Sequence, residues 1–245
     1  MKVLATYNIK GGVGKTSAAV NLAYLAAGSG RRTLLWDLDP QGAATYLFKL
    51  RPAVRGGGRS LIRGKRELDD VVQATEYERL DVVPADFRYR TMDLALEAEK
   101  KPTRRLRRLL ERTARDYDLA VLDCPPSVSL VSENVLQAAQ LLVVPLIPTT
   151  LSVRSYEQLR TFAAQAPPPQ PRTLAFFSLV DRRRRLHRET VERMIQEEGV
   201  AGAIVPQSTL VEQMSVRQAP VNVFAPKSAV AEAYAQLWAE ARARL

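Results

Sequence analysis

The chain has 245 residues, 46% apolar and 25% charged, which is typical of a globular protein with an extensive core. No run of about 18 apolar residues marks a membrane span, and the single cysteine, Cys124, excludes an intrachain disulfide framework and fits a reducing cytoplasm. The net charge of +10 indicates an anionic partner, nucleic acid or membrane, although a basic surface without a partner is the alternative.

The first predicted elements are a strand over residues 2–7, a glycine-rich loop and a helix from about Lys15 to Ala27. The loop departs from the usual phosphate-binding pattern G-x-x-x-x-G-K-[ST], because Ile9 replaces the first glycine and Lys10 adds a second lysine. Backbone N–H groups of such a loop, and the positive end of the helix after it, bind phosphate oxygens. We expect a nucleotide to contact Gly11, Gly12, Val13, Gly14, Lys15, Thr16 and Ser17.

Three side chains of this loop have separate expected roles. Lys15 would neutralise the β- and γ-phosphates of a nucleotide, and the Thr16 hydroxyl would bind Mg²⁺. Lys10 adds positive charge beside a loop that is already basic, which is unfavourable unless this lysine faces further negative charge. The alternative, a glycine-rich turn with incidental lysines, is disfavoured by the order of strand, loop and helix.

The next segments continue the alternation of strands and helices. An apolar strand over residues 32–38 leads into the sequence DLDPQG and is predicted to be central and parallel. Residues 51–66 are rich in glycine and arginine and predict a mobile surface loop. A further strand is expected over residues 80–84.

An arginine-rich helix is predicted over residues 103–115, with Thr103 as its N-cap. One side of this helix carries leucines, and the other carries Arg104, Arg105, Arg107, Arg108, Arg112 and Arg115. A solvated helix face and a second anion-binding surface both fit this pattern.

The remaining strands are predicted over residues 119–122, 141–148 and 173–180, and the Pro-rich stretch 167–171 is expected to form a rigid surface turn. Ser228 is expected to cap a final helix. Strands that alternate with helices predict an α/β fold, in which a mostly parallel twisted sheet carries helices on both faces. We expect one domain over residues 1–245.

Three acidic residues, Asp37, Asp39 and Asp123, follow predicted strands. Because the carboxyl ends of parallel strands share one edge of a sheet, these side chains are expected near the phosphate loop. Asp123 fits a Walker B acid that holds Mg²⁺, directly or through water, and Asp39 is the candidate to orient the attacking water. A structural role, such as capping a helix, is the alternative for each acid.

These three motifs, KGGVGKT at 10–16, DLDPQG at 37–42 and DCPPS at 123–127, resemble those of the ParA/MinD family of deviant-Walker P-loop ATPases, and of its ParA branch in particular. The resemblance implies ATP and Mg²⁺ as ligands, with Lys10, Lys15 and Asp39 catalytic and Thr16, Asp39 and Asp123 at the metal. It also implies a nucleotide-sandwich homodimer in which Lys10 reaches the ATP of the other subunit.

In that family, ATP-bound dimers bind DNA non-specifically and are released after hydrolysis that a ParB-like or cargo-adaptor protein stimulates. The cargo is a plasmid, a chromosome region or a protein complex, and the resemblance implies a cytoplasmic, nucleoid-associated protein. The phosphate motif begins near residue 10, so we expect no N-terminal DNA-binding domain of the kind that longer ParA proteins carry.

The family also suggests positions outside the three motifs. Asp181 and Pro206 are candidates for adenine contacts. The DNA-binding candidates are Arg182, Arg183, Arg184, Arg185, Arg217 and Lys227, and a solvated loop is the alternative for the four-arginine run. We interpret Cys124 as a small buried residue and His187 as a surface residue without a catalytic role.

Two other functions remain open from the sequence. A MinD-like membrane-associated ATPase would need a C-terminal amphipathic helix that presents bulky apolar residues to lipid. A metabolic P-loop enzyme of the same superfamily would need a small-molecule pocket, and its iron–sulfur members need two cysteines per chain, whereas this chain has one.

Overall fold

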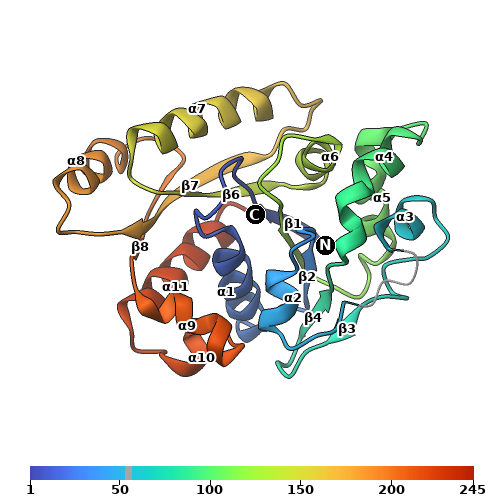
Figure 1. Ribbon diagram of the computed structural model, residues 1–245, viewed down its shortest axis with the longest axis horizontal. Coiled ribbons are helices and arrows are strands. Elements are labelled where there is room, and N and C mark those ends of the chain that lie inside the picture. The colour runs from blue at the N-terminus through green and yellow to red at the C-terminus, as the bar shows by residue number, and fades with distance from the viewer. Residues whose placement is uncertain (53–56) are drawn as a thin grey trace.

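A computed structural model describes residues 1–52 and 57–245 of the chain. Over these residues the protein forms one sheet of eight strands in the order β3-β4-β2-β5-β1-β6-β7-β8 (Figure 1). The strands are β1 (Lys2–Thr6), β2 (Thr33–Asp37), β3 (Gln73–Ala74), β4 (Leu80–Val83), β5 (Leu119–Asp123), β6 (Leu141–Leu146), β7 (Arg172–Val180) and β8 (Val200–Pro206). All neighbouring strands are parallel except β3 and β4, which confirms the predicted α/β class.

Helices cover both faces of the sheet (Figure 1). One face packs against α3 (Gly57–Ile62), α4 (Met92–Glu97), α5 (Arg105–Arg112), α6 (Leu130–Ala138), α7 (Thr150–Ala164) and α8 (Arg185–Met194). The other packs against α1 (Lys15–Gly28), α2 (Ala43–Leu47), α9 (Thr209–Arg217), α10 (Val221–Phe224) and α11 (Ala229–Arg242). Two short 3₁₀ helices, η1 (Phe87–Thr91) and η2 (Pro102–Arg104), complete the described part of the chain.

The central strands are buried on both faces, which explains why they read as continuous apolar runs. In β2, Leu34 and Trp36 belong to the core cluster under α3–α8, whereas Leu35 belongs to the cluster under α1 and α11. Side chains alternate between faces with a period of two, so each strand contributes to both cores. Because these strands are also parallel, the loops at their carboxyl ends lie at one common edge of the sheet.

The prediction of a mobile loop over residues 51–66 is wrong for residues 57–62. Residues 57–62 form helix α3, in which Leu61 and Ile62 are fully buried. A Cβ at Gly58 would lie 2.6 Å from Met92 and 2.8 Å from Tyr89, so glycine permits this close packing. Residues 53–56 lie outside the described part of the chain.

The arginine-rich helix is shorter than predicted and has a different cap. Helix η2 starts at Pro102, and α5 follows over Arg105–Arg112 without a side-chain cap from Thr103. The Oδ1 atom of Asn134 on α6 instead accepts hydrogen bonds from the N–H groups of Arg105 (2.8 Å) and Leu106 (3.1 Å). Arg105 is buried rather than solvated, and its guanidinium donates to the carbonyl of Leu61 at 2.9 Å.

The prediction that His187 lies on the surface is also wrong. His187, Thr190 and Met194 line the buried side of α8, and only 2% of His187 is exposed. Its Nδ1 atom accepts a 3.1 Å hydrogen bond from the N–H of Asp181, which joins α8 to the end of β7. The final helix agrees with prediction, because the Ser228 hydroxyl accepts from the N–H of Ala231 at the start of α11.

Candidate functional site

The phosphate loop connects β1 to α1 and depends on glycine at its last position. Gly14 has a φ of 97° and stands at the N-cap of α1. A Cβ at this position would lie 2.8 Å from the Oγ atom of Ser178 on β7. Both the left-handed backbone and the close approach exclude a larger residue. The loop thus opens directly into the positive end of a 14-residue helix.

Asn8, which the sequence analysis did not single out, fixes the loop at its start. It is fully buried, and its Nδ2 atom donates a 2.8 Å hydrogen bond to the carbonyl of Pro145. Its Oδ1 atom accepts from the N–H of Lys10 at 2.9 Å. An asparagine two residues before a turn residue often makes this contact, so its position was the available signal.

Lys15 is held beneath the loop with part of its hydrogen-bonding capacity unused. The residue is 7% exposed, and its Nζ atom donates a 2.8 Å hydrogen bond to the carbonyl oxygen of Lys10. An ammonium has three N–H donors, and this carbonyl is its one acceptor among the described residues. Burial lowers the pKa of Lys15, whereas the nearby charges of Asp123 and Asp39 oppose that shift. The remaining donors can therefore meet phosphate oxygens.

Asp123 ends β5 next to the loop, with one carboxylate oxygen unsatisfied. The side chain is fully buried, and its Oδ1 atom accepts a long 3.4 Å hydrogen bond from the hydroxyl of Thr6. The Oδ2 atom has no hydrogen-bond partner among the described residues. Burial raises the pKa of Asp123 well above its usual range, and the charge of Asp37 adds to the shift, while the Thr16 hydroxyl and Lys15 oppose it. A buried oxygen without a partner fits a site that a cation completes.

Asp37 is the register partner of Asp123 on β2 but has a different task. Its Oδ2 atom accepts hydrogen bonds from both the N–H (2.8 Å) and the hydroxyl (2.7 Å) of Thr45 in α2. Its Oδ1 atom accepts from the N–H of Asp39 at 3.2 Å. Burial raises its pKa to about 6, although the Thr45 hydrogen bonds oppose the shift. Asp37 therefore holds α2 and the following loop against the sheet, which is the structural alternative considered for these acids.

Asp39 lies in the loop between β2 and α2 and is partly exposed. Its Oδ1 atom accepts from the N–H of Gln41 at 2.9 Å, an arrangement that fixes the start of the turn. The charge of Asp39 opposes the lowering of the pKa of Lys15 and adds to the raising of the pKa of Asp123. The structure brings together the strand-end acids and the loop that the sequence placed at one edge.

These residues fit Mg²⁺ bound together with a nucleotide. The described residues contain no cluster of three or more His, Cys, Asp or Glu side chains able to hold a metal by themselves. Mg²⁺ keeps several waters and is commonly held by one or two protein groups and substrate phosphates. The Thr16 hydroxyl and the unpartnered oxygen of Asp123 supply such groups.

Known proteins are similar to this chain over its whole length. A family model described as an AAA domain matches residues 1–167. The sporulation initiation inhibitor protein Soj of Bacillus subtilis is 29% identical over 249 residues, which cover 99% of this chain and 98% of Soj. The chromosome partitioning protein ParA of Caulobacter vibrioides is 32% identical over 253 residues, which cover 100% of this chain and 95% of that protein. The chain belongs to the ParA/Soj family of P-loop ATPases.

The resemblance drawn from the three motifs is thereby confirmed, and the fold agrees with it. A cobyrinic acid a,c-diamide synthase from Mycobacterium smegmatis, solved with an ATP analogue and magnesium, aligns with a TM-score of 0.81 at 28% identity. The alignment covers 98% of this chain and 93% of that one. In this ParA-family ATPase, the phosphate loop follows β1 and Asp123 ends the neighbouring parallel strand β5.

The two adenine candidates lie at the same edge of the sheet: Asp181 directly follows β7, and Pro206 is the last residue of β8. Both carboxylate oxygens of Asp181 accept hydrogen bonds from the guanidinium of Arg183, at 3.0 and 3.1 Å, which lowers the pKa of Asp181 to about 2. Pro206 pairs in register with Val180 and lines a cavity of about 440 Å³ beside Arg182. The interpretation of Cys124 is consistent with its position, because it is buried and burial raises the pKa of its thiol.

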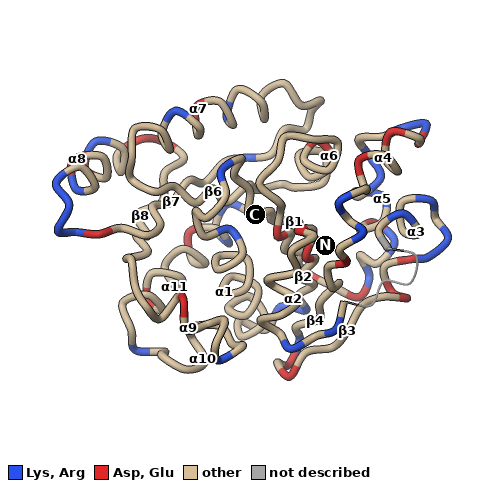
Figure 2. Tube along the Cα trace, in the orientation of Figure 1, with Lys and Arg blue, Asp and Glu red and all other residues tan. Residues whose placement is uncertain are grey.

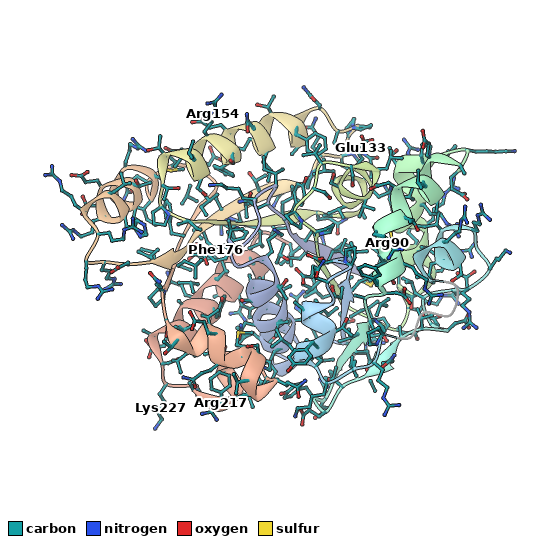
Figure 3. The ribbon with its side chains drawn as sticks, in the orientation of Figure 1. Arg90, Glu133, Arg154, Phe176, Arg217 and Lys227 are labelled. Carbon is teal, nitrogen blue, oxygen red and sulfur yellow. The ribbon has the colours of Figure 1, made fainter. Side chains whose placement is uncertain are left out.

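The DNA candidates of this ParA-family chain lie in two places. Arg182 to Arg185 form an exposed run that leads from β7 into the first residue of α8 (Figure 2). Within the run, Arg183 pairs with Asp181 and Arg185 pairs with Glu189. Arg217 ends α9 and Lys227 lies between α10 and α11 (both labelled in Figure 3), and the Arg217 guanidinium stacks over Phe224.

Proposed function

We propose that this ATPase binds ATP and Mg²⁺ at the phosphate loop, dimerises around the nucleotide, holds DNA non-specifically as a dimer, and leaves DNA after hydrolysis. The observation that carries the proposal is the state of Lys10. Its backbone is fixed on both sides, by Asn8 and by Lys15, at 2.9 and 2.8 Å. Among the described residues, however, its ammonium has no hydrogen-bond or ion-pair partner. A second copy's phosphates would supply one.

Each residue of the site has a defined task in this reaction. Backbone N–H groups of residues 11–16 and the free donors of Lys15 bind the β- and γ-phosphates of ATP. Thr16 and Asp123 hold Mg²⁺, which when bound neutralises charge on those phosphates. Asp39 orients the attacking water from the partly exposed loop after β2. Lys10 of the opposite subunit stabilises the charge that develops on the γ-phosphate, as an arginine finger does.

DNA binding by the dimer is proposed to use Arg182, Arg184, Arg217 and Lys227, which have no carboxylate partner in the described part of the chain. Contacts from such side chains to phosphates are independent of base sequence and weaken with salt. A nucleoid-associated location would follow from this activity. A ParB-like or cargo-adaptor protein would then stimulate hydrolysis and place the cargo, a plasmid, a chromosome region or a protein complex.

A MinD-like membrane function is less well supported, because the apolar side of the final helix is buried in the protein core and does not face outward toward a lipid surface. Tyr234, Leu237 and Trp238 of α11 are buried in the core cluster that also contains α1 and β8. Across the ranges 1–52 and 57–245, no helix has the length and apolar character needed to cross a membrane. A metabolic role would show as turnover that requires a small-molecule substrate and is independent of DNA.

The deciding experiment measures oligomeric state and DNA binding of the wild type and of Asp39→Ala, with ATP and with ADP. Wild type should dimerise with ATP but not with ADP and should bind duplex DNA more tightly with ATP, and Asp39→Ala should remain dimeric and DNA-bound because hydrolysis is blocked. Lys15→Ala is the control that should fail to bind nucleotide. An Asp39→Ala protein that with ATP neither dimerises nor binds DNA would overturn the proposal. Co-sedimentation with anionic vesicles in place of DNA would support the MinD-like alternative.

A further inference from the structure

The positive charge of this protein is concentrated in two segments, residues 57–66 and 100–115. Together they contain twelve of the 36 Lys and Arg residues and one of the 26 Asp and Glu residues, Glu111. The rest of the chain therefore has 24 basic and 25 acidic residues, a formal charge of −1. Twelve basic residues and one acidic residue give these two segments a formal charge of +11, and the acidic residues Glu67 and Asp69 lie just beyond the first segment. We call these two segments the α3–α5 basic surface.

The two segments are joined by specific contacts, so their charges are brought together by the fold. The guanidinium of Arg105 donates to the carbonyl of Leu61 at 2.9 Å, and Arg112 forms an ion pair with Glu67 just after α3. Thr113 also bonds to Asp69. Figure 2 shows the basic residues of α3, α5 and the α4–α5 connection gathered at one end of the molecule.

Some basic side chains of this surface are buried or form ion pairs, but most of them are exposed and have no acidic partner in the described ranges. Arg105 is buried, while Arg107 and Arg112 are paired with Glu111 and Glu67. Eight exposed basic residues have no carboxylate partner in the described ranges: Arg59, Arg63, Lys65, Lys100, Lys101, Arg104, Arg108 and Arg115. Like charges this close repel one another, and the repulsion is relieved when a polyanion binds.

The chemistry of the surface favours a phosphate backbone over a lipid surface. Most of the unpaired groups are arginines, and a guanidinium binds two phosphate oxygens at once. Membrane-binding helices need apolar side chains that enter the lipid. The leucines of α5, Leu106, Leu109 and Leu110, are instead buried against the sheet and α6.

We propose that the α3–α5 basic surface is a second DNA-binding surface, which contacts the phosphates of duplex DNA without sequence preference. The proposal rests on the DNA binding proposed above and extends it to a part of the chain outside residues 182–227. The two regions lie at opposite ends of the sheet, one beside α3 and α5 and the other beside β8 (Figure 2). Because the new surface is complete in one chain, it binds DNA without nucleotide-driven dimerisation.

The test compares two triple variants that lose the same charge. In the first, Arg104, Arg108 and Arg115 are changed to Ala; in the control, Arg154, Arg193 and Arg242, which are also exposed and unpaired in the described chain, are changed to Ala. Arg154 points outward from α7 (Figure 3). Affinity for a random-sequence duplex is measured by fluorescence anisotropy over a series of salt concentrations, without nucleotide and with ATP.

The first variant should lower the slope of log K against log salt by about 2 to 3, because each phosphate contact contributes about 0.9. The loss should occur with and without nucleotide, and the control should retain the wild-type slope. Thermal unfolding of both variants checks folding. A second variant, with Arg104, Arg108 and Arg115 changed to Gln, removes the same charge but keeps longer side chains. This Gln variant should show the same reduced slope.

Three outcomes separate this inference from the function proposed above. Wild-type slopes in the first variant, with ATP-dependent DNA binding intact, would overturn the inference and leave the proposed function standing. Nucleotide-free binding that the first variant lacks, with no increase on adding ATP, would support the inference and contradict the proposed dimer switch. Binding of the surface to phosphatidylglycerol vesicles but not to DNA would overturn the inference in favour of a lipid partner.

Discussion

The Nζ atom of Lys15 lies 2.8 Å from the carbonyl oxygen of Lys10, so the side chain of one loop lysine fixes the backbone of the other. This contact separates the two residues chemically. Lys15 is buried, whereas Lys10 contributes a main-chain oxygen here and its ammonium has no partner among the residues that the structure describes. Substitutions at the two positions should therefore have different consequences.

Lys15→Ala should reduce the affinity for ATP by about 100-fold or more, because hydrogen bonds to charged groups contribute about 1.5–3 kcal/mol each. Titration calorimetry with a non-hydrolysable ATP analogue measures the loss. The variant should fold normally, since burial already disfavours the ammonium and lowers its pKa. Unchanged nucleotide affinity in a folded Lys15→Ala protein would contradict the assignment of Lys15.

Gly14→Ala should destabilise the protein by about 1–3 kcal/mol, because alanine is strained at a φ of 97° and its Cβ would lie 2.8 Å from Ser178. Gly11→Ala is the matched control in the same loop, since a Cβ there has no atom within 4 Å. Urea unfolding without nucleotide measures both. Equal stabilities of the two variants would show that the loop does not need its glycine at position 14.

Substitution of Asp37 should lower the stability of the protein, whereas substitution of Asp123 should change the Mg²⁺ dependence of nucleotide binding. Asp37→Ala should cost about 1–3 kcal/mol, because the buried N–H and hydroxyl of Thr45 lose their acceptor. Asp123→Ala should leave stability nearly unchanged and remove the effect of Mg²⁺ on nucleotide binding, since one of its oxygens has no partner. Urea unfolding and calorimetry with and without Mg²⁺ separate the two. A reversed pattern would exchange the roles of these acids.

His187 should make stability depend on pH. Burial lowers the pKa of His187 below its usual value of about 6.5, and the charge of Arg184 adds to this effect while Asp181 opposes it. Below about pH 6.5 the unfolded chain takes up a proton that the folded protein resists. The contribution of His187 to stability should therefore fall as the pH decreases from 7 to 5, by at most about 1.4 kcal/mol per pH unit, whereas Asp37, with its raised pKa, contributes in the opposite direction.

His187→Asn, which keeps an acceptor for the N–H of Asp181, should lack this contribution and lose less stability than the wild type as the pH decreases from 7 to 5. Urea unfolding of both proteins at several pH values measures the difference in slope. Identical pH dependence of the wild type and the variant would show that this buried histidine titrates as it does in the unfolded chain.

The sequence predicted most of the sheet, because buried parallel strands such as β2 and β5 are apolar over their whole length. It also predicted that Lys15 starts a helix after a glycine-rich loop and that Asp123 ends a strand, since both are local signals. Helix α3 was missed because its glycine-rich composition hides the burial of Leu61 and Ile62. That burial depends on contacts with residues distant in the chain.

The errors at Arg105 and His187 have a similar cause. An arginine in a basic helix reads as solvated, and only the contact with the Leu61 carbonyl shows otherwise. A lone histidine in a charged segment reads as exposed, although its spacing to Thr190 and Met194 gave a weak helical signal of burial. The separate roles of Asp37 and Asp123 could not be read from sequence either, because they depend on where Thr45 lies.

The most direct test of the dimer switch is the sedimentation of Lys10→Ala and wild type with a non-hydrolysable ATP analogue and Mg²⁺, alongside nucleotide affinity. Lys10→Ala keeps the backbone carbonyl that Lys15 uses, so its nucleotide affinity should stay close to that of the wild type. The account predicts a dimeric wild type and a monomeric Lys10→Ala under these conditions. A Lys10→Ala protein that dimerises as the wild type does, or a wild type that remains monomeric with bound nucleotide, would contradict it.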